Sequence, residues 1–180
     1  MSKSIDLGIL VGRFQVLHKG HGAVIRKAMN YCNEVGIFVG SAQEAGTAKN
    51  PFSYEQRKEY LQLVFPDAKV FPLVDIGVGN SYKWGAYVID NVIERFGRKP
   101  EVLFSGREER RLYWVDDSMD IAEMYIPKVI DISATKMKEF IIADDKDSWN
   151  EYIEPALVPR YEEMRKIILA SKDNLYTESV

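Results

Sequence analysis

The sequence predicts an α/β protein with a Rossmann-like, doubly wound parallel sheet of about five strands, helices on both faces, and a helical C-terminal part. Two observations lead to this prediction. Short apolar runs alternate with amphipathic stretches of helical period, which is the pattern of β-α-β units. Polar or glycine-bearing loops follow the first four apolar runs, at the sheet edge where such folds bind ligands.

The opening unit is β-loop-α-β. Residues 6–11 and 35–39 are apolar and predict two buried strands. A helix over residues 20–32 separates them. Its apolar residues fall at i, i+3, i+4 and i+7: Ile25, Ala28, Met29 and Cys32. This stripe also predicts a core position for the cysteine.

The next unit begins after a loop over residues 41–51. Ser53 followed by Gln56 is a capping-box pattern that begins a helix, and Pro66 ends it. A third strand is predicted over residues 70–74. Because this strand contains a proline, we expect it at an edge of the sheet or with a bend.

The second half contains a helix over residues 88–96, ended by Gly97, and a fourth strand over residues 102–104. A loop is predicted over 75–83, a helix over 107–114 and a turn over 116–120. Of two strand candidates, over 123–126 and 129–132, one is expected to be the fifth strand. A helix capped by Ser133 follows over 134–143, and residues 149–171 form two helical pieces broken near Pro155–Pro159. We expect one domain over residues 1–145, C-terminal helices over 146–171 packed on it, and a flexible tail over 172–180.

Composition excludes several classes of protein. The 180 residues carry a net charge of −3, which does not suggest a nucleic-acid groove. Cys32 is the only cysteine, so no intramolecular disulfide can form and a reducing cytoplasm is expected. No apolar run has membrane-spanning length, and Arg13 interrupts the N-terminal apolar run, which argues against a signal peptide.

Two histidines, His18 and His21, follow the first predicted strand and are the only histidines in the sequence. A strand that opens through Gly12 into a helix N-terminus presents backbone N–H groups and the positive end of the helix dipole to phosphate. The simpler alternative is a helix start at which one histidine caps and the other packs. A zinc site would need further ligands, and none is placed to suggest one.

Residues 12–15, Gly-Arg-Phe-Gln, together with His18-Lys19-Gly20-His21, resemble the His-x-Gly-His signature of the nucleotidyltransferase superfamily. The match is similar to the archaeal-type nicotinamide mononucleotide (NMN) adenylyltransferases and to the adenylyltransferase half of bifunctional Nudix proteins. That family usually has Pro-Phe before the first histidine, where this chain has Val16-Leu17. The resemblance implies transfer of AMP from ATP to NMN, giving NAD and pyrophosphate, with Mg²⁺ bridging phosphate oxygens.

Residues 132–138, Ile-Ser-Ala-Thr-Lys-Met-Lys, resemble the second signature of the superfamily, Ile-Ser-x-Thr-x-x-Arg. The resemblance implies a phosphate contact at the last position, where Lys138 keeps the charge of arginine but loses its bidentate fork. An ordinary capped surface helix is the alternative.

Three further segments resemble parts of the same family. Ser41-Ala42-Gln43 and Asn50-Pro51-Phe52-Ser53, followed by Arg57, imply that this arginine reaches the ATP phosphates; a solvated helix arginine is the alternative. Asp75, Asn80 and Trp84 imply a nicotinamide pocket in which the indole stacks on the ring, with plain helix packing as the competing interpretation. Ser105-Gly106-Arg107 imply a turn against the adenosine.

The resemblance thus implies a complete set of site residues and no protein metal ligand. Catalytic roles fall to His18, His21, Arg57 and Lys138. ATP contacts fall to Gly12, Arg13, Phe14, Gln15, Gly20, Gly106, Arg107, Ile132, Ser133 and Thr135. NMN contacts fall to Asp75, Asn80 and Trp84.

Other functions stay open. The acceptor could instead be nicotinate mononucleotide, pantetheine phosphate or flavin mononucleotide, or the chain could be a non-catalytic nucleotide sensor. The sequence contains no Walker A pattern and no Gly-x-Gly-x-x-Gly after a strand, which argues against kinases, NTPases and dehydrogenases. Members of the resembled family often form closed homo-oligomers, and the sequence alone shows no interface.

Overall fold

A computed structural model describes residues 3–106, 114–115 and 117–171. The sheet has five parallel strands in the order β3-β2-β1-β4-β5. The strands are β1 (Ile5–Gly12), β2 (Cys32–Val39), β3 (Lys69–Pro72), β4 (Val102–Ser105) and β5 (Ala122–Tyr125). The predicted fold class is confirmed, and β3 lies at an edge as its proline requires.

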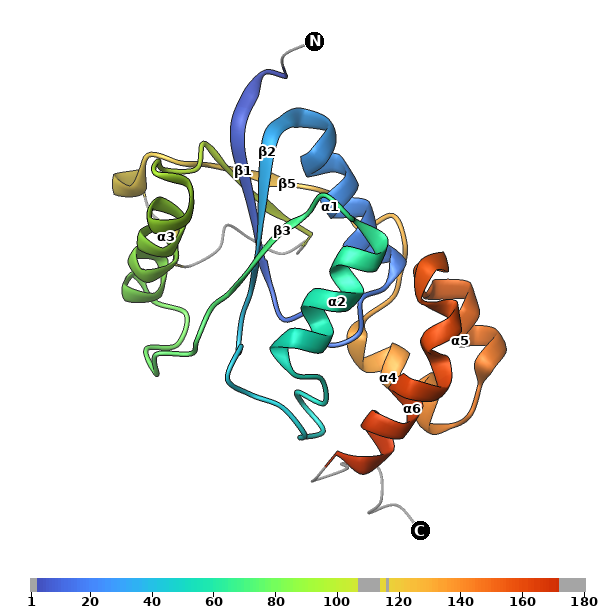
Figure 1. Ribbon diagram of the computed structural model, residues 1–180. Helices are drawn as coiled ribbons and strands as arrows, with labels where there is room; N and C mark the ends of the chain where they lie inside the picture. The colour runs from blue at the N-terminus through green and yellow to red at the C-terminus, as the bar shows by residue number, and fades with distance from the viewer. Residues whose placement is uncertain (1–2, 107–113, 116, 172–180) are drawn as a thin grey trace.

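Helices cover both faces of the sheet (Figure 1). The helices are α1 (Lys19–Tyr31), α2 (Tyr54–Val64), α3 (Tyr82–Phe96), α4 (Ala134–Ile142), α5 (Lys146–Tyr152) and α6 (Tyr161–Ala170), with 3₁₀ turns η1 (Asp117–Met119) and η2 (Pro155–Arg160). In Figure 1, α3 lies on one side of the strands, while α1 and α2 lie on the other. The C-terminal helices α4, α5 and α6 gather beside α1 and α2.

The alternation of side chains along β1 divides the core between the two faces. Leu7 and Ile9 pack in a cluster with Val88 of α3. Leu10 points to the other face, in a cluster that also contains Ile25 of α1. Trp149 of α5 belongs to this second cluster, so the C-terminal helices pack on the same core as the sheet.

The strand order contains one reversal. The chain runs outward from β1 through β2 to β3, and then returns to β4 on the other side of β1. In open parallel sheets such a reversal leaves a crevice at the carboxyl ends of the two central strands, where ligands bind. Here that crevice lies beyond the ends of β1 and β4.

Local signals explain most element boundaries. The Ser53 capping box of α2 is present, the Ser133 side chain caps α4, and Gly97 ends α3 with a left-handed φ of 69°. The predicted break between two helical pieces near Pro155–Pro159 is confirmed, since it separates α5 from α6. The segment forms η2, because a proline at the first position suits a helix start.

Several predicted boundaries differ from the structure. Cys32 begins β2 rather than ending α1, although it is buried as expected. The fifth strand is β5 at 122–125, and the segment over 129–132 is not a strand. Helix α5 begins before residue 149, because the Asp145 side chain caps it by accepting from the Ser148 N–H.

Some predictions fall outside the described residues. They include most of the helix expected over 107–114 and the tail expected over 172–180. The division into a domain over 1–145 and helices over 146–171 stays a prediction. No helix within the described ranges is both long and apolar enough to cross a membrane.

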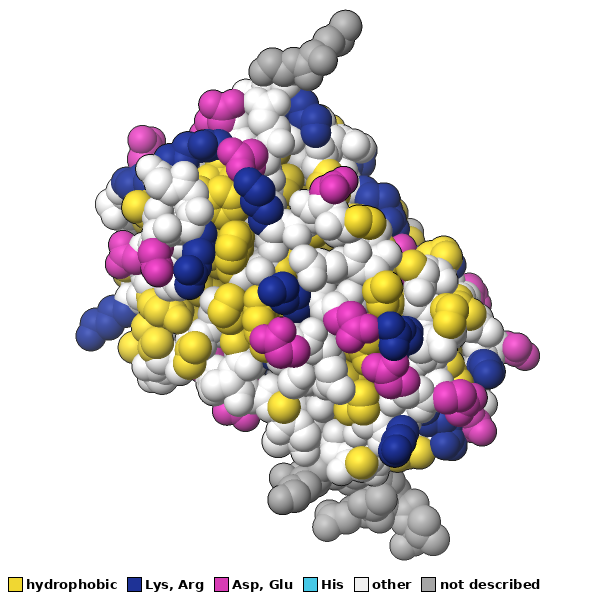
Figure 2. Space-filling view, in the orientation of Figure 1, with side chains coloured by type: hydrophobic (Ala, Val, Ile, Leu, Met, Phe, Trp, Pro, Cys, Tyr) yellow, Lys and Arg dark blue, Asp and Glu magenta, His cyan; other side chains and the backbone are white. Residues whose placement is uncertain are grey.

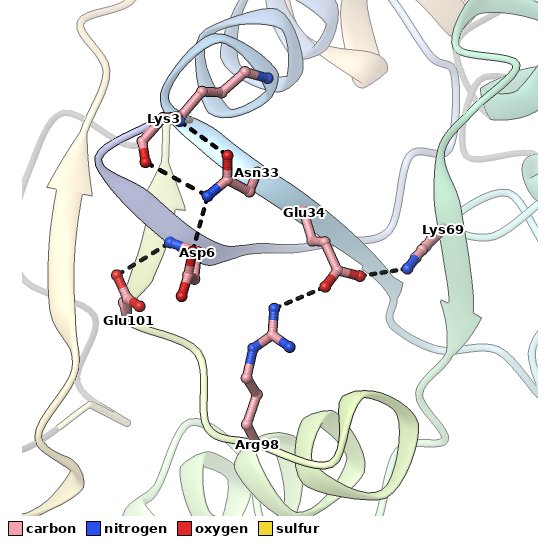
Figure 3. A network of polar contacts seen from close by, with 7 residues as sticks. All are labelled: Lys3, Asp6, Asn33, Glu34, Lys69, Arg98 and Glu101. Carbon is pink, nitrogen blue, oxygen red and sulfur yellow. Dashed lines mark hydrogen bonds and ion pairs between the residues drawn. The ribbon is translucent and has the colours of Figure 1, made fainter. Parts of the chain in front are cut away.

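Charges of both signs are interspersed over the face of the molecule shown in Figure 2. At the amino ends of the strands, seven polar residues form a network (Figure 3). Within it, Glu34 of β2 pairs with Lys69 of β3 and, at 2.7 Å, with Arg98. The network therefore ties the edge strand and the turn after α3 to the centre of the sheet, at the end opposite the crevice.

Candidate active site

A cavity of about 630 Å³ occupies the crevice at the carboxyl ends of β1 and β4. The loop after β1, the start of α1, the loop after β3 and the segment 126–134 form its walls. Site residues predicted from the sequence that line it are Gly12, Arg13, Phe14, Gln15, His18, Gly20, His21, Asp75, Asn80, Trp84, Gly106, Ile132 and Ser133. Arg57, Thr135 and Lys138 are not in the lining, and Arg107 lies outside the described residues.

The loop after β1 is held in an unusual conformation. Phe14 has a φ of 50°, a left-handed value that costs free energy for a bulky residue. The Gln15 side chain, which is buried, donates to the Phe52 carbonyl at 3.1 Å and accepts from the Phe52 N–H at 3.0 Å. The Gln15 side chain therefore holds this loop against the segment before α2. Gln15 also borders the cavity.

His18 and His21 lie together at the start of α1. Their rings stack with centroids 3.8 Å apart, and the ring of Phe14 lies 5.2 Å from that of His21. His18 is the N-cap: its Nδ1 accepts from the backbone N–H of His21 at 3.3 Å. Because Nδ1 accepts this bond, we assign the proton of the neutral ring to Nε2, which would be the donor to a ligand.

Both histidines are neutral in this environment. Burial, the neighbouring His21 and Lys128 lower the pKa of His18 to about 2. Burial lowers the pKa of His21 to about 4, although a hydrogen bond with the Val16 backbone opposes this shift. The buried Nδ1 of His21 has no hydrogen-bond partner in the described part of the chain. A neutral imidazole carries one N–H, and that of His21 is engaged by the Val16 backbone, so His18 is the donor of the pair at a helix N-terminus where an anion is favoured.

Arg57 is fully buried, and its guanidinium contacts backbone carbonyls. Its Nη1 donates to the carbonyls of Arg13 at 3.0 Å and Gly40 at 2.8 Å, and its Nη2 donates to that of Ser41 at 2.9 Å. Ser41, like Phe14, has a left-handed φ of 50°. The arginine thus joins the loops that leave β1 and β2, rather than facing the cavity.

Arg13 and Lys138 complete a cluster of cations with Arg57. Nη1 of Arg13 lies 3.5 Å from Oδ1 of Asn50, and Nζ of Lys138 donates to the Ala48 carbonyl at 2.7 Å. Burial and the charge of Arg13 lower the pKa of Lys138. The same two causes lower the pKa of Arg57 to about 10. Mutual repulsion of this kind is relieved when an anion binds.

The second motif contributes the start of α4. Ser133 accepts from the Lys136 N–H at 3.1 Å, and Ile132 is buried beside it. Thr135 is exposed and lies outside the lining. Gly106 follows β4, and a Cβ added to it would lie 3.0 Å from the Val24 side chain, so backbone closely approaches α1 here.

The predicted nicotinamide residues lie at the other side of the cavity. Asp75 and Asn80 are exposed, and the Asp75 N–H donates to Gln43 at 3.0 Å. Trp84, in the first turn of α3, is partly buried and has its ring 5.4 Å from that of Tyr87. An indole that lines a cavity while packing on its own helix fits both of the interpretations that its sequence left open.

Contacts that sequence reasoning missed come from the C-terminal helices. His18 forms an antiparallel bridge with Ile153, and Lys19 donates to the Glu151 carbonyl at 2.5 Å. The buried Glu154 pairs with Arg26 at 2.5 Å and fills the space beside Gly22, where an added Cβ would lie 1.7 Å from its carboxylate. The turn after α5 thus supports the start of α1, and no local motif in residues 151–154 signals this.

Lys128 is a second residue that sequence reasoning missed. It lines the cavity in the segment between β5 and α4 and pairs with Asp131 at 2.6 Å. Within the described ranges, no three His, Cys, Asp or Glu side chains are grouped so that they could hold a metal ion.

Parallel α/β folds bind ligands at this edge of the sheet, and a helix N-terminus there selects anions. The fold and the site therefore define a Rossmann-like protein of the nucleotide-binding class. The chain belongs to the cytidylyltransferase-like family, whose model matches residues 9–140. The resemblance inferred from the two signatures is thereby confirmed at the level of the family.

Curated relatives carry a more specific name. The nicotinamide-nucleotide adenylyltransferase of Pyrococcus horikoshii is 28% identical over 166 residues, which cover 89% of this chain and 84% of the relative. The enzyme of the same name from Thermococcus kodakarensis is 28% identical over 163 residues, covering 87% and 79%.

Solved structures share the fold. A bifunctional NMN adenylyltransferase/ADP ribose pyrophosphatase from Francisella tularensis superposes with a TM-score of 0.74 at 21% identity, covering 91% of this chain and 50% of that one. This chain thus spans about half the length of the Francisella protein. A second structure of that protein, complexed with AMP and a manganese ion, has a TM-score of 0.73 at 20% identity, covering 92% of this chain and 52% of that one.

Proposed function

We propose that this chain is a nicotinamide-nucleotide adenylyltransferase, which transfers AMP from ATP to NMN and gives NAD and pyrophosphate. The observation that carries the proposal is the stacked, neutral His18–His21 pair at the N-terminus of α1, which lines a cavity at the switch point of the sheet. The shared name of the archaeal relatives supports the choice of reaction.

In the proposed reaction, an oxygen of the NMN 5′-phosphate attacks the α-phosphorus of ATP. A new P–O bond forms as the bond from that phosphorus to the bridging oxygen of the β-phosphate breaks, and pyrophosphate leaves with the electron pair. No residue needs to form a covalent intermediate. The protein contributes by holding two anions in line and by stabilising charge on the phosphates.

The chain's own residues would divide this work. Nε2–H of His18 and the backbone N–H groups that begin α1 would donate to the transferring phosphate. Arg13, which lines the cavity, would neutralise the triphosphate. Residues around Gly106, Ile132 and Ser133 would enclose the adenosine. Arg57 and Lys138 donate to backbone carbonyls, so they would act indirectly, by holding the loops that carry these contacts in place.

Mg²⁺ would enter with ATP. Magnesium bound to nucleotides is held mainly by phosphate oxygens and water with one or two protein carboxylates, so a preformed protein cage is not required. The metal would supply charge neutralisation at the phosphates.

NMN is the acceptor that we propose, because Asp75 borders the pocket assigned to the pyridine ring. A carboxylate there can accept from the carboxamide of nicotinamide but repels the carboxylate of nicotinate. Trp84 would stack on the ring, with Asn80 beside it. We place this reaction in the cytoplasm, in keeping with a single buried cysteine. A homo-oligomer, common in the resembled family, stays a prediction.

Incubation of the purified protein with ATP, Mg²⁺ and NMN tests the proposal, with NAD measured by enzymatic reduction to NADH. Nicotinate mononucleotide runs in parallel and is assayed for its own dinucleotide. We expect NAD from NMN, and its loss in His18→Ala. Product with neither acceptor, while ATP still binds, would favour another phosphate acceptor or the nucleotide sensor.

A further inference from the structure

We propose that Lys128 is a catalytic residue of this site, which leaves its ion pair with Asp131 to bind a phosphate oxygen of the nucleotide held at His18. This inference rests on the proposed adenylyltransferase function. Lys128 lies outside both sequence signatures. The proposed reaction above gives it no role.

The position of Lys128 is the first argument. Segment 126–134 forms the wall of the cavity that runs from the end of β5 to the start of α4, and Lys128 is part of the lining. The lysine is close enough to His18 for its charge to lower the pKa of that imidazole. Lys128 and the start of α1 therefore share the same part of the cavity.

The positions of the other cationic side chains are the second argument. The motifs imply phosphate contacts at Arg57 and Lys138, but both donate to backbone carbonyls and neither lines the cavity. Among the lysines and arginines of the described ranges, the lining contains Arg13 and Lys128. A triphosphate bound here would thus meet Lys128 without any rearrangement of the carbonyl-bound pair.

The resting partner of Lys128 is the third argument. Nζ lies 2.6 Å from the carboxylate of Asp131, whose side chain is almost entirely exposed. An exposed ion pair of this kind contributes little to stability, so replacing it with a lysine–phosphate contact costs little free energy. Asp131 would hold the lysine at the rim of the cavity until an anion replaces it.

Lys136 provides a matched control. It lies eight residues along the chain and pairs with Glu139 at 3.1 Å in the same i,i+3 arrangement, but it does not line the cavity. Lys128→Met and Lys136→Met each remove one charge and keep most of the aliphatic stem. Lys128→Arg keeps the charge, and Asp131→Asn removes the competing carboxylate.

Steady-state kinetics with ATP and NMN varied separately give the main readout. We expect kcat/KM to fall about 10- to 100-fold in Lys128→Met, the range for loss of a charge-assisted hydrogen bond, and to be largely restored in Lys128→Arg. Lys136→Met should match the unmodified chain, and Asp131→Asn should match or exceed it. An effect confined to the KM for ATP assigns the contact to the triphosphate, and one confined to the KM for NMN assigns it to the NMN phosphate.

Calorimetric titration with ATP and with pyrophosphate separates this inference from the proposed function. If the unmodified chain makes no dinucleotide, the proposed function fails, but Lys128→Met should still weaken the binding of these anions relative to Lys136→Met. If both methionine variants behave alike in kinetics and in titration, Lys128 is an ordinary surface lysine and the inference is overturned.

Discussion

Arg57 donates a guanidinium N–H to the backbone carbonyl of Arg13 at 3.0 Å, so the two arginines that the motifs assign to phosphate are linked through main chain. Arg57 is buried, whereas Arg13 lines the cavity. The same guanidinium binds the carbonyls of Gly40 and Ser41. Its bonds thus flank two left-handed residues, Phe14 and Ser41, which we infer it stabilises.

Replacement of Arg57 by lysine tests this inference. Lysine keeps the charge but cannot donate to three separate carbonyls from a planar fork. We expect Arg57→Lys to lose about 1–3 kcal/mol of unfolding free energy per carbonyl left unpaired, with a fall in kcat. Urea denaturation and steady-state kinetics measure both. A variant of unchanged stability that shows only a raised KM for ATP would instead place Arg57 on the phosphates.

Asparagine at position 18 separates the two roles of His18. Asparagine is a good N-cap, so His18→Asn should keep the bond to the His21 N–H and retain its stability. It lacks the Nε2–H, and we expect kcat to fall by about 100-fold or more. His18→Ala should lose about 1 kcal/mol in addition, for the missing cap. Equal activity of His18→Asn and the unmodified chain would exclude a catalytic histidine at this position.

The pH dependence of stability follows from the same histidines. The folded chain resists protonation of His18 until about pH 2 and of His21 until about pH 4, whereas an unfolded histidine takes up a proton near 6.5. Between pH 6.5 and 4 the unfolded state binds more protons, so the unfolding free energy falls as the pH falls. Each histidine contributes at most about 1.4 kcal/mol per pH unit.

The comparison with His18→Asn isolates one of these contributions, because all carboxylates titrate in both proteins. Urea denaturation at pH 7, 5.5 and 4.5 should give a shallower decline for the variant. Parallel curves would mean that His18 is protonated in the folded state and that its environment is more polar than we infer.

The features that could be predicted from the sequence are those set by residues close together in the chain. The period of apolar residues predicted the strands, and the Ser53 and Ser133 caps predicted where α2 and α4 begin. The paired histidines predicted one wall of the cavity. The burial of Arg57 was not predictable, since helix α2 has to pack against two loops before its carbonyl partners exist. The bridge between His18 and Ile153 likewise joins segments 135 residues apart, which no local pattern reports.

Glu34 should matter for stability and not for catalysis. It joins Lys69 and Arg98 at the amino ends of the strands, away from the cavity, and these charges hold its pKa below the ordinary value (Figure 3). Because the pairs are largely exposed, we expect Glu34→Gln to cost less than about 1 kcal/mol, with a smaller effect in high salt. Denaturation at two salt concentrations measures this, and a changed kcat would contradict it.

Trp84 offers a test of the nicotinamide pocket. If the indole stacks on the pyridine ring, Trp84→Ala should raise the KM for NMN about tenfold, in the range of one lost aromatic contact, and leave the KM for ATP nearly unchanged. Trp84→Phe should recover part of the affinity. Tyr82→Ala removes an exposed aromatic two residues away that does not line the cavity, so it should leave both constants unchanged. Equal increases for both substrates in Trp84→Ala, together with lower stability, would show that the indole only packs α3 against its neighbours.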